Sequence, residues 1–214
     1  GLLRDLQGAK STGVIAEHPE QGLTEIAQPV GVVAAAVPST NPAATPANNI
    51  INALKCGNAV IVAPSPKGYS TCTLLLKYVH EELKRAGAPA DLVQQLPAPV
   101  TRELTNELMK QVDLVVVTGS QNNVRAGYSS GKPALGVGTG NVGVIVDESA
   151  DCADAARKIM ASKIFDNATS CSSENAVIIH DKVYTKMIAA LAKEGGVLLT
   201  AQDKETLQKA MFPG

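Results

Sequence analysis

Short apolar runs bounded by turn residues alternate with longer amphipathic segments along most of the chain. The first run, residues 30–37, is rich in Val and Ala and ends just before Pro38. Such a run is typical of a strand buried on both faces of a parallel sheet. Thr45-Pro46 then pairs an N-cap residue with a first-turn proline, and Gly57 is a typical helix stop. These signals predict a helix over 46–55.

The same unit recurs three times. Further strands are predicted at 59–63, 92–96, 113–117 and 133–137, and further helices at 70–86, 101–110 and 121–129. Within the helix at 70–86, Leu75, Val79 and Leu83 recur every four residues and mark its buried face. Strands that alternate with helices favour a parallel sheet with right-handed crossovers. The predicted fold class is α/β, a doubly wound parallel sheet.

A second segment begins after Gly140. It contains predicted strands at 142–146 and 176–180 and predicted helices at 152–163 and 183–193. We therefore divide the chain into residues 1–140 and residues 141–214, the latter being the start of a second α/β domain. The chain opens at Gly1 without a methionine and stops soon after a helix-like pattern. We expect it to be part of a longer polypeptide.

Composition and charge argue against nucleic-acid binding and membrane association. Lys and Arg number 19 against 20 for Asp and Glu, and the aromatic residues are 4 Tyr and 2 Phe with no Trp. Nucleic-acid binders usually carry a basic excess and stacking aromatics, so no nucleic-acid partner is predicted. The longest apolar run is too short to span a bilayer, and no signal-peptide pattern opens the chain. We predict no membrane association.

Cysteine and histidine spacing excludes two further kinds of site. The four cysteines form no CxxC pair: Cys56, Cys72, Cys152 and Cys171. The three histidines show no metal-ligand spacing: His18, His80 and His180. A disulfide framework is improbable in a chain of this length with so few cysteines. The sequence therefore favours a reduced, cytoplasmic protein without a metal site.

Polar turns follow three of the predicted strands, at 38–42, 63–66 and 118–120. Ligands of open α/β sheets bind at the carboxyl ends of the strands. Each turn alone is an ordinary strand-to-helix connection, but three on one edge favour a ligand site. The glycine-rich segment 136–141 is either a tight turn or a place of close ligand approach, because it lacks the GxGxxG spacing.

Cys171 differs from the other cysteines because its neighbours over 167–175 are mostly polar. A free cysteine is usually a small buried hydrophobe, which is how we interpret Cys56, Cys72 and Cys152. An accessible thiol in a polar segment can instead be a nucleophile whose thiolate is stabilised by backbone N–H groups. Glu174, three residues on, is either a proton acceptor or a solvated surface residue.

Taken together and in this order, these motifs resemble the aldehyde dehydrogenase superfamily, in particular its CoA-acylating branch. The matching segments are 31–42, 57–60, 117–119, 128–141 and 165–167 ahead of Cys171. The segment 168–175 is similar to that of branch members that act on sulfoacetaldehyde. The resemblance implies that residues 1–140 are a Rossmann-like nucleotide-binding domain lacking its N-terminal part. Residues 141–214 would begin the catalytic domain, in a homo-oligomer such as a dimer or tetramer.

The resemblance also implies the chemistry. An NAD- or NADP-dependent enzyme would oxidise an aldehyde through a thiohemiacetal and a thioester on Cys171, and coenzyme A would take the acyl group. Sulfoacetaldehyde, giving sulfoacetyl-CoA, is the candidate substrate. The oxyanion would be held by the Cys171 backbone N–H and the Asn41 side chain, although a gapless alignment places Thr40 there. The implied cofactor-binding residues are Pro38, Ser39, Thr40, Ala63, Pro64, Ser65, Lys67, Gly119, Ser120, Gly138 and Thr139.

Two positions depart from the water-using members of the superfamily. Their general-base Glu matches Gly136, and their ribose-binding carboxylate matches Pro66. Water is a poor nucleophile without a base, whereas a thiol with a pKa of about 8.5 is partly ionised near neutrality. The sequence therefore favours a thiol acceptor. A water-using aldehyde dehydrogenase and a non-catalytic nucleotide-binding fragment remain the alternatives.

Overall fold

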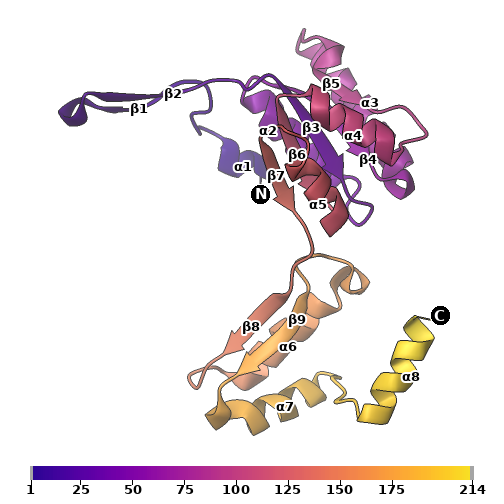
Figure 1. The fold of residues 1–214 in the computed structure, drawn as a ribbon. Coiled ribbons are helices and arrows are strands. Elements are labelled where there is room, and N and C mark those ends of the chain that lie inside the picture. The colour runs from indigo at the N-terminus through magenta and orange to yellow at the C-terminus, as the bar shows by residue number, and fades with distance from the viewer. Residues whose placement is uncertain (1, 213–214) are drawn as a thin grey trace. The chain divides into compact units, whose positions relative to one another are not determined.

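The structure is a computed structural model that describes residues 2–212. The chain divides into two compact units, Gly1–Thr139 and Gly140–Gly214, whose elements are labelled in Figure 1. Over residues 2–212, none of the helices combines the length and apolar character needed to cross a bilayer.

A five-stranded parallel sheet forms the centre of the first unit, in the order β5-β4-β3-β6-β7. The strands are β3 (Val32–Val37), β4 (Ala59–Pro64), β5 (Val93–Gln95), β6 (Leu114–Thr118) and β7 (Ala134–Val137). They are joined by helices α2 (Ala44–Lys55), α3 (Tyr69–Arg85), α4 (Arg102–Gln111) and α5 (Gln121–Tyr128). The predicted doubly wound α/β fold is confirmed.

Two hydrophobic clusters cover opposite faces of this sheet. Val33, Ala35 and Val37 of β3 pack with buried residues of α2 and α3. Ala34 and Ala36 pack with buried residues of α4 and α5. Alternate residues of a strand point to opposite faces, so a strand covered on both sides needs a continuous apolar run. The predicted face of α3 is also confirmed, because Leu83 is buried and Leu75 and Val79 pack against the same core.

Two local predictions are wrong. Helix α2 begins at Ala44 with Ala43 as its N-cap residue, so Thr45 lies within the helix, and the Ala44 backbone N–H donates to Asn41 Oδ1 at 3.1 Å. Cys56, expected to be buried, is only half-buried because it ends α2 at the edge of the core.

The polar opening of the chain contains regular structure that its hydrophobic pattern did not predict. A short helix α1 (Leu2–Leu6) precedes an antiparallel hairpin of β1 (Gly13–His18) and β2 (Leu23–Ala27). The short 3₁₀ helix η1 (Pro19–Gln21) makes the turn, which Gly22 closes at φ 63° in the left-handed region that glycine favours. Diagonally across the hairpin, where His18 pairs with Leu23 and Ala16 with Glu25, His18 Nε2 and Glu25 Oε1 lie 3.0 Å apart.

Buried Asn58, the residue before β4, anchors the start of β3. Its Oδ1 accepts hydrogen bonds from the backbone N–H groups of Val30 at 2.7 Å and Gly31 at 3.0 Å. The next N–H, of Val32, donates to Asp113 Oδ2 at 2.8 Å. Gly31 has a φ of 120°, and a Cβ there would lie 2.2 Å from Asp113 Oδ2. This end of β3 is therefore fixed by side chains distant in sequence.

The second unit is built on a parallel pair of strands, β8 (Val142–Val146) and β9 (Glu174–Ile179). Helix α6 (Cys152–Lys163) lies between them in the chain, and α7 (Tyr184–Lys193) and α8 (Ala201–Met211) follow β9. The core of this unit is formed by Val146, Cys152, Ala156 and Met187. The parallel pairing confirms that a strand–helix–strand crossover also begins this segment.

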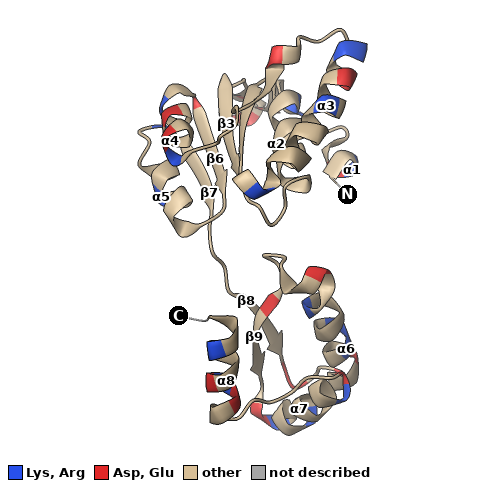
Figure 2. Ribbon diagram, turned by 90° about the vertical axis from the view of Figure 1, so that its right-hand side faces the viewer, with Lys and Arg blue, Asp and Glu red and all other residues tan. Residues whose placement is uncertain are grey.

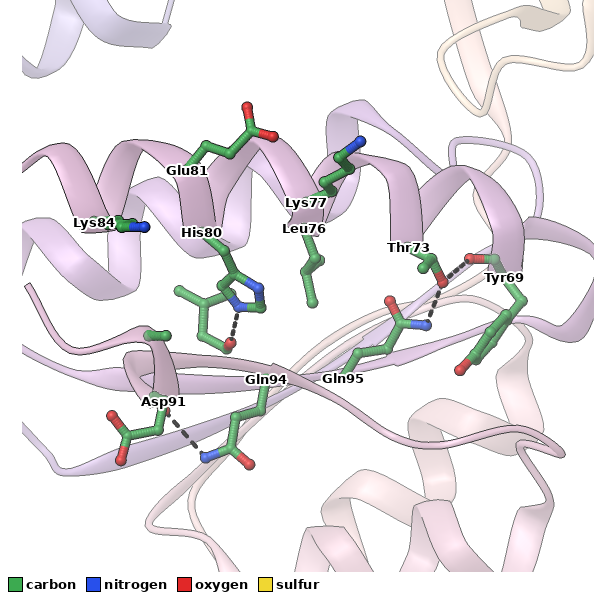
Figure 3. Close-up of a pocket in the computed structure, with 12 residues that line it drawn as sticks. Tyr69, Thr73, Leu76, Lys77, His80, Glu81, Lys84, Asp91, Gln94 and Gln95 are labelled. Atoms are coloured by element: carbon green, nitrogen blue, oxygen red, sulfur yellow. Dashed lines mark hydrogen bonds between the residues drawn. The ribbon is translucent and has the colours of Figure 1, made fainter.

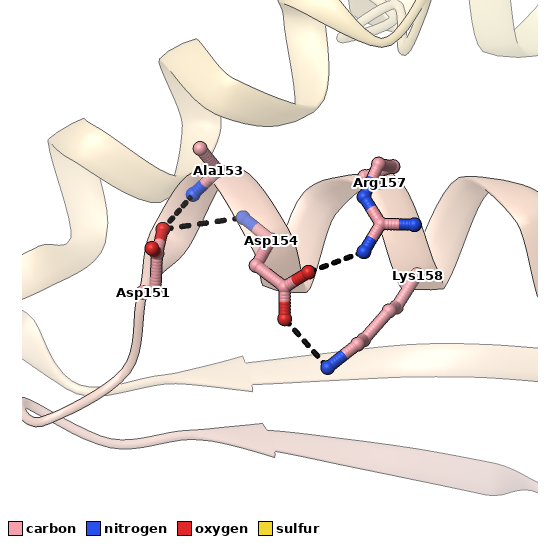
Figure 4. A network of polar contacts seen from close by, with 5 residues as sticks. All are labelled: Asp151, Ala153, Asp154, Arg157 and Lys158. Carbon is pink, nitrogen blue, oxygen red and sulfur yellow. Dashed lines mark hydrogen bonds and ion pairs between the residues drawn. The ribbon is translucent and has the colours of Figure 1, made fainter.

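Helix α6 has a capped and charge-paired first turn (Figure 4). Asp151 Oδ1 accepts hydrogen bonds from the backbone N–H groups of Ala153 at 3.0 Å and Asp154 at 3.2 Å. Lys158, at 2.5 Å, and Arg157 both bind the Asp154 carboxylate and lower its pKa. After Asp154, the charged residues of this helix are all basic (Figure 2).

We predict that acid unfolds the second unit before the first. Hydrogen bonds lower the pKa of four described carboxyl groups of the second unit, from Ser149 to Asp147, Lys158 to Asp154, Ser162 to Glu174 and Thr200 to Asp203. In the first unit, Glu103 is the described carboxyl group whose pKa is clearly lowered. A carboxylate whose pKa is lower in the folded state stabilises the fold above its unfolded pKa, about 4, and this contribution is lost as the pH falls.

Amide NMR signals recorded between roughly pH 6 and pH 2 would follow both units at once. Signals of β8 and β9 should disappear at a higher pH than those of β3 and β4. Simultaneous loss of both sets would contradict the prediction.

Candidate active site

The carboxyl ends of four strands meet at one edge of the first unit's sheet. Val37 at the end of β3 pairs with Pro64, and Thr118 at the end of β6 pairs with Val137. The predicted cofactor-binding residues lie at or just beyond these strand ends: Pro38, Ser39, Thr40, Ala63, Pro64, Ser65, Lys67, Gly119, Ser120, Gly138 and Thr139. The connections diverge between β3 and β6, and such a switch point is where open α/β sheets bind ligands.

The loops after β3 and β4 are packed on each other. Gly68 is buried, and a Cβ added to it would lie 2.6 Å from Pro42 Cβ. Ser65 N–H also donates to the Val37 carbonyl at 3.2 Å. The fold therefore brings the loop that carries Ser39 and Thr40 against the loop that carries Lys67.

The residues of this edge differ in what they offer a ligand. Ser39, Thr40, Lys67 and Thr139 are exposed. Ala63 and Pro64 are buried, so their side chains belong to the core. Ser120 is exposed, but its Oγ accepts a hydrogen bond from Asn123 N–H at 3.3 Å and caps α5. The edge therefore presents hydroxyl groups, one ammonium group and backbone.

Asn41 and Thr40 are both exposed in the loop after β3. Because Asn41 Oδ1 is bound by the Ala44 N–H, its side-chain orientation is set and its Nδ2 is the group that is left to donate. An amide nitrogen held in this way can serve as a donor to an oxyanion.

The glycine-rich segment 136–141 is partly strand. Gly136 lies inside β7, and its N–H donates to Tyr128 Oη at 3.2 Å. The tight-turn interpretation therefore does not apply to Gly136. Gly119 N–H donates to the Val137 carbonyl at 3.0 Å and ties the loop after β6 to the end of β7.

Cys171 lies in the second unit, in a turn between the 3₁₀ helix η4 (Phe165–Ala168) and β9, and is exposed. The three residues Asp166, Asn167 and Ala168 have φ values of 50°, 52° and 59°. Residues other than glycine rarely adopt this left-handed conformation, and such strain occurs preferentially at functional sites. Ser170 Oγ and Ser172 Oγ, on either side of the thiol, lie 2.8 Å apart.

Glu174 begins β9 and is half-buried, so it is not the fully solvated surface residue that was one of its two interpretations. A hydrogen bond from Ser162 lowers its pKa, which makes the carboxylate a weaker base. Over the described chain, Glu174 Oε2 and the buried Ser173 Oγ have no hydrogen-bond partner. Two polar atoms beside Cys171 are therefore unsatisfied.

A groove between α3 and β5 was not predicted from the sequence (Figure 3). Within it, Gln95 Nε2 donates to Thr73 Oγ1 at 2.9 Å, and His80 Nε2 lies 2.7 Å from the Val93 carbonyl oxygen. These bonds tie α3 to the edge strand, so we interpret the groove as structural. Between residues 2 and 212, no three His, Cys, Asp or Glu side chains cluster as metal ligands would.

The four cysteines differ in exposure, and we predict that iodoacetamide alkylates Cys171 first. Cys171 is exposed and Cys56 is half-buried, whereas Cys72 and Cys152 are buried. Burial raises the pKa of Cys72 to about 11, which suppresses its reactive thiolate. Peptide mapping of the native protein after brief labelling gives the order. Labelling of Cys56, Cys72 or Cys152 before Cys171 would contradict the prediction.

Comparisons with known proteins agree with the sequence motifs. The model of the aldehyde dehydrogenase family matches residues 1–208. The chain is 65% identical over 212 residues to the acylating sulfoacetaldehyde dehydrogenase of Cupriavidus necator, covering 99% of this chain and 43% of that protein.

Solved structures give the same relationship. An acetylating aldehyde dehydrogenase from Geobacillus thermoglucosidasius superposes with a TM-score of 0.90 at 38% identity, covering 99% of this chain and 47% of that one. A Rhodopseudomonas palustris propionaldehyde dehydrogenase with bound CoA and an acylated cysteine gives 0.78 at 32%, covering 86% and 42%. The chain thus spans less than half of each of these relatives. Because the family match extends over nearly every residue, the protein belongs to the aldehyde dehydrogenase family.

Proposed function

We propose that the complete protein carrying this chain oxidises an aldehyde to an acyl-CoA, with NAD or NADP as electron acceptor. The observation that carries the proposal is an exposed Cys171 on a strained turn, in a chain similar along its length to acylating enzymes. A relative with bound CoA and an acylated cysteine supports the same chemistry. The glycine at position 136, where water-using relatives carry a base, supports a thiol rather than water as acceptor.

We assign the cofactor to the carboxyl edge of the first unit and the nucleophile to the second. The packed loops around Pro42 and Gly68 and the exposed Ser39, Thr40 and Lys67 fit a dinucleotide with hydroxyl and phosphate groups. When bound, NAD or NADP accepts the two electrons and the hydrogen removed from the substrate carbon.

The chain's own residues supply the covalent steps. The Cys171 thiolate forms a C–S bond to the aldehyde carbon, and the negative charge moves to the carbonyl oxygen. We assign that oxyanion to the Cys171 N–H together with Asn41 Nδ2, with Thr40 as the alternative to Asn41. After oxidation, the CoA thiolate attacks the thioester carbon and the Cys171 sulfur leaves as a thiolate. No carboxylate base is required, because the acceptor thiol is partly ionised.

Sulfoacetaldehyde is our candidate substrate, because the Cupriavidus necator relative is named for it. The test is an assay of the complete protein with sulfoacetaldehyde and NAD or NADP, with and without CoA, and with acetaldehyde as the comparison substrate. We expect sulfoacetyl-CoA only when CoA is present. Free acid formed without CoA would favour a water-using enzyme. No turnover of either aldehyde by folded protein would favour a non-catalytic nucleotide-binding module.

Lys67 is predicted to distinguish the two cofactors. Pro66 replaces the carboxylate that would repel a 2′-phosphate, and the exposed Lys67 ammonium follows it. We expect NADP to bind at least as well as NAD, and Lys67→Ala to weaken NADP selectively by roughly 1 kcal/mol. Titration gives both dissociation constants. Lys84→Ala, at the far end of α3, should change neither. An equal loss for both cofactors would show that Lys67 does not contact the phosphate.

We propose a reducing, cytoplasmic location and a homo-oligomeric state. Four free cysteines suit a reducing compartment.

The β1–β2 hairpin exposes Val14, Leu23 and Ile26, and an isolated two-stranded hairpin is only marginally stable. A second copy covering these residues would stabilise it. Light scattering of the complete protein tests for the dimer or tetramer.

A further inference from the structure

Position 136 favours glycine because a side chain there would clash with its neighbours, and not because of its backbone conformation. Its φ lies outside the left-handed region, since it is part of strand β7. A Cβ at this position would lie 2.7 Å from Val124 Cγ1 and 2.9 Å from Tyr128 Cε2, both on helix α5. Real Cβ atoms essentially never approach other atoms this closely. A side chain at position 136 therefore has no room on the side where its Cβ would project.

Of the two neighbours, Val124 has the less freedom to move away. Val124 is 7% exposed, belongs to the core and is branched at Cβ, so its rotamer is restricted. Tyr128 is 60% exposed, and the hydrogen bond from Gly136 N–H to its hydroxyl positions its ring. Helix α5 itself lies close to the sheet, since a Cβ at Gly127 would be 2.8 Å from Val117 Cγ2. The tight approach is thus a property of the whole α5–sheet contact.

We propose that Val124 and Tyr128 help determine the acyl acceptor, by denying position 136 any side chain. The proposal rests on the proposed function, in which this position matches the carboxylate base of water-using relatives. In hydrolysis that carboxylate takes a proton from water while the water oxygen attacks the thioester carbon and the Cys171 sulfur leaves. Helix α5 leaves no room for such a base. Val124 and Tyr128 are positioning residues, and thiol selectivity is built into the packing.

The packing is tested on the chain itself by a thermodynamic cycle. Gly136→Ala should lower the melting temperature by roughly 5 °C, because overpacking costs stability. In a Val124→Ala/Tyr128→Ala background the same substitution should cost less than half of that shift. Tyr128→Ala alone, at a mostly exposed residue, serves as the background if the double variant is too unstable. Gly143→Ala is the matched control, since a Cβ at this strand glycine has no atom within 4 Å. An equal cost of Gly136→Ala in both backgrounds would overturn the proposal.

The acceptor is tested in the complete protein by the ratio of free acid to acyl-CoA, which does not depend on the fraction of folded enzyme. Gly136→Glu alone should leave the ratio within twofold of the parent, as should Val124→Ala/Tyr128→Ala. Combining all three should raise it at least about tenfold, which is less than the roughly 10²- to 10⁴-fold that a well-positioned general base contributes. A rise with Gly136→Glu alone, or none with the triple variant, overturns the proposal. If the parent makes no acyl-CoA, the proposed function fails. The melting temperatures of the Gly136→Ala variants then still show whether Val124 and Tyr128 exclude a side chain from position 136.

Discussion

Replacing Cys171 with alanine is expected to lower aldehyde oxidation by the complete protein by at least about 10³-fold. The thiolate forms the covalent bond that the later steps require, and alanine offers no nucleophile. Cys171 is exposed on a turn, so the substitution removes no core contact. Binding of NAD and NADP at the sheet edge of the first unit should change less than twofold. Steady-state rates and cofactor titrations measure the two effects separately.

Cys56→Ala is the control for this experiment. Cys56 is a half-buried cysteine at the end of α2, and it lies outside every proposed role. Its variant should keep parental turnover within a few-fold. Comparable residual activity of Cys171→Ala and the parent would mean that another residue is the nucleophile. Loss of cofactor binding together with activity would instead indicate a folding defect.

The largest effect on stability is expected from Asn58→Ala, at about 2 kcal/mol of unfolding free energy. Asn58 is 7% exposed, and its Oδ1 accepts two backbone hydrogen bonds at the start of β3. Alanine would leave the N–H groups of Val30 and Gly31 without this partner. The cost comes mainly from these unsatisfied donors rather than from lost apolar contact. Urea unfolding of the chain, followed by circular dichroism, measures it.

Asn106→Ala provides the comparison, because Asn106 is exposed within α4. Alanine is the better helix former, so this variant should change stability by less than about 0.5 kcal/mol. If Asn58→Ala behaves like Asn106→Ala, water replaces the Asn58 oxygen and the anchor contributes little.

The central strands β3 and β4 were predictable because they are mostly buried. Their continuous apolar runs gave bounds within two residues of the observed ones at each end, and the predicted bounds of β5, β6 and β7 were equally close. The β1–β2 hairpin has no such run, since its residues are exposed or half-buried, and its strands were not predicted. The start of α2 was also misplaced, because its N-cap residue is Ala43 and not Thr45.

The candidate site was likewise predictable from the sequence only in part. The sequence alone determined the fold class, the family and the residues that lie at the carboxyl edge, because each of these is encoded in local runs and ordered motifs. It also showed a glycine at position 136, but not the reason for it. Only the tertiary structure decided that Val124 and Tyr128 leave this position no space, and that Pro42 packs on Gly68. Such contacts depend on how closely a helix or a second loop approaches after folding, and no local pattern specifies that distance.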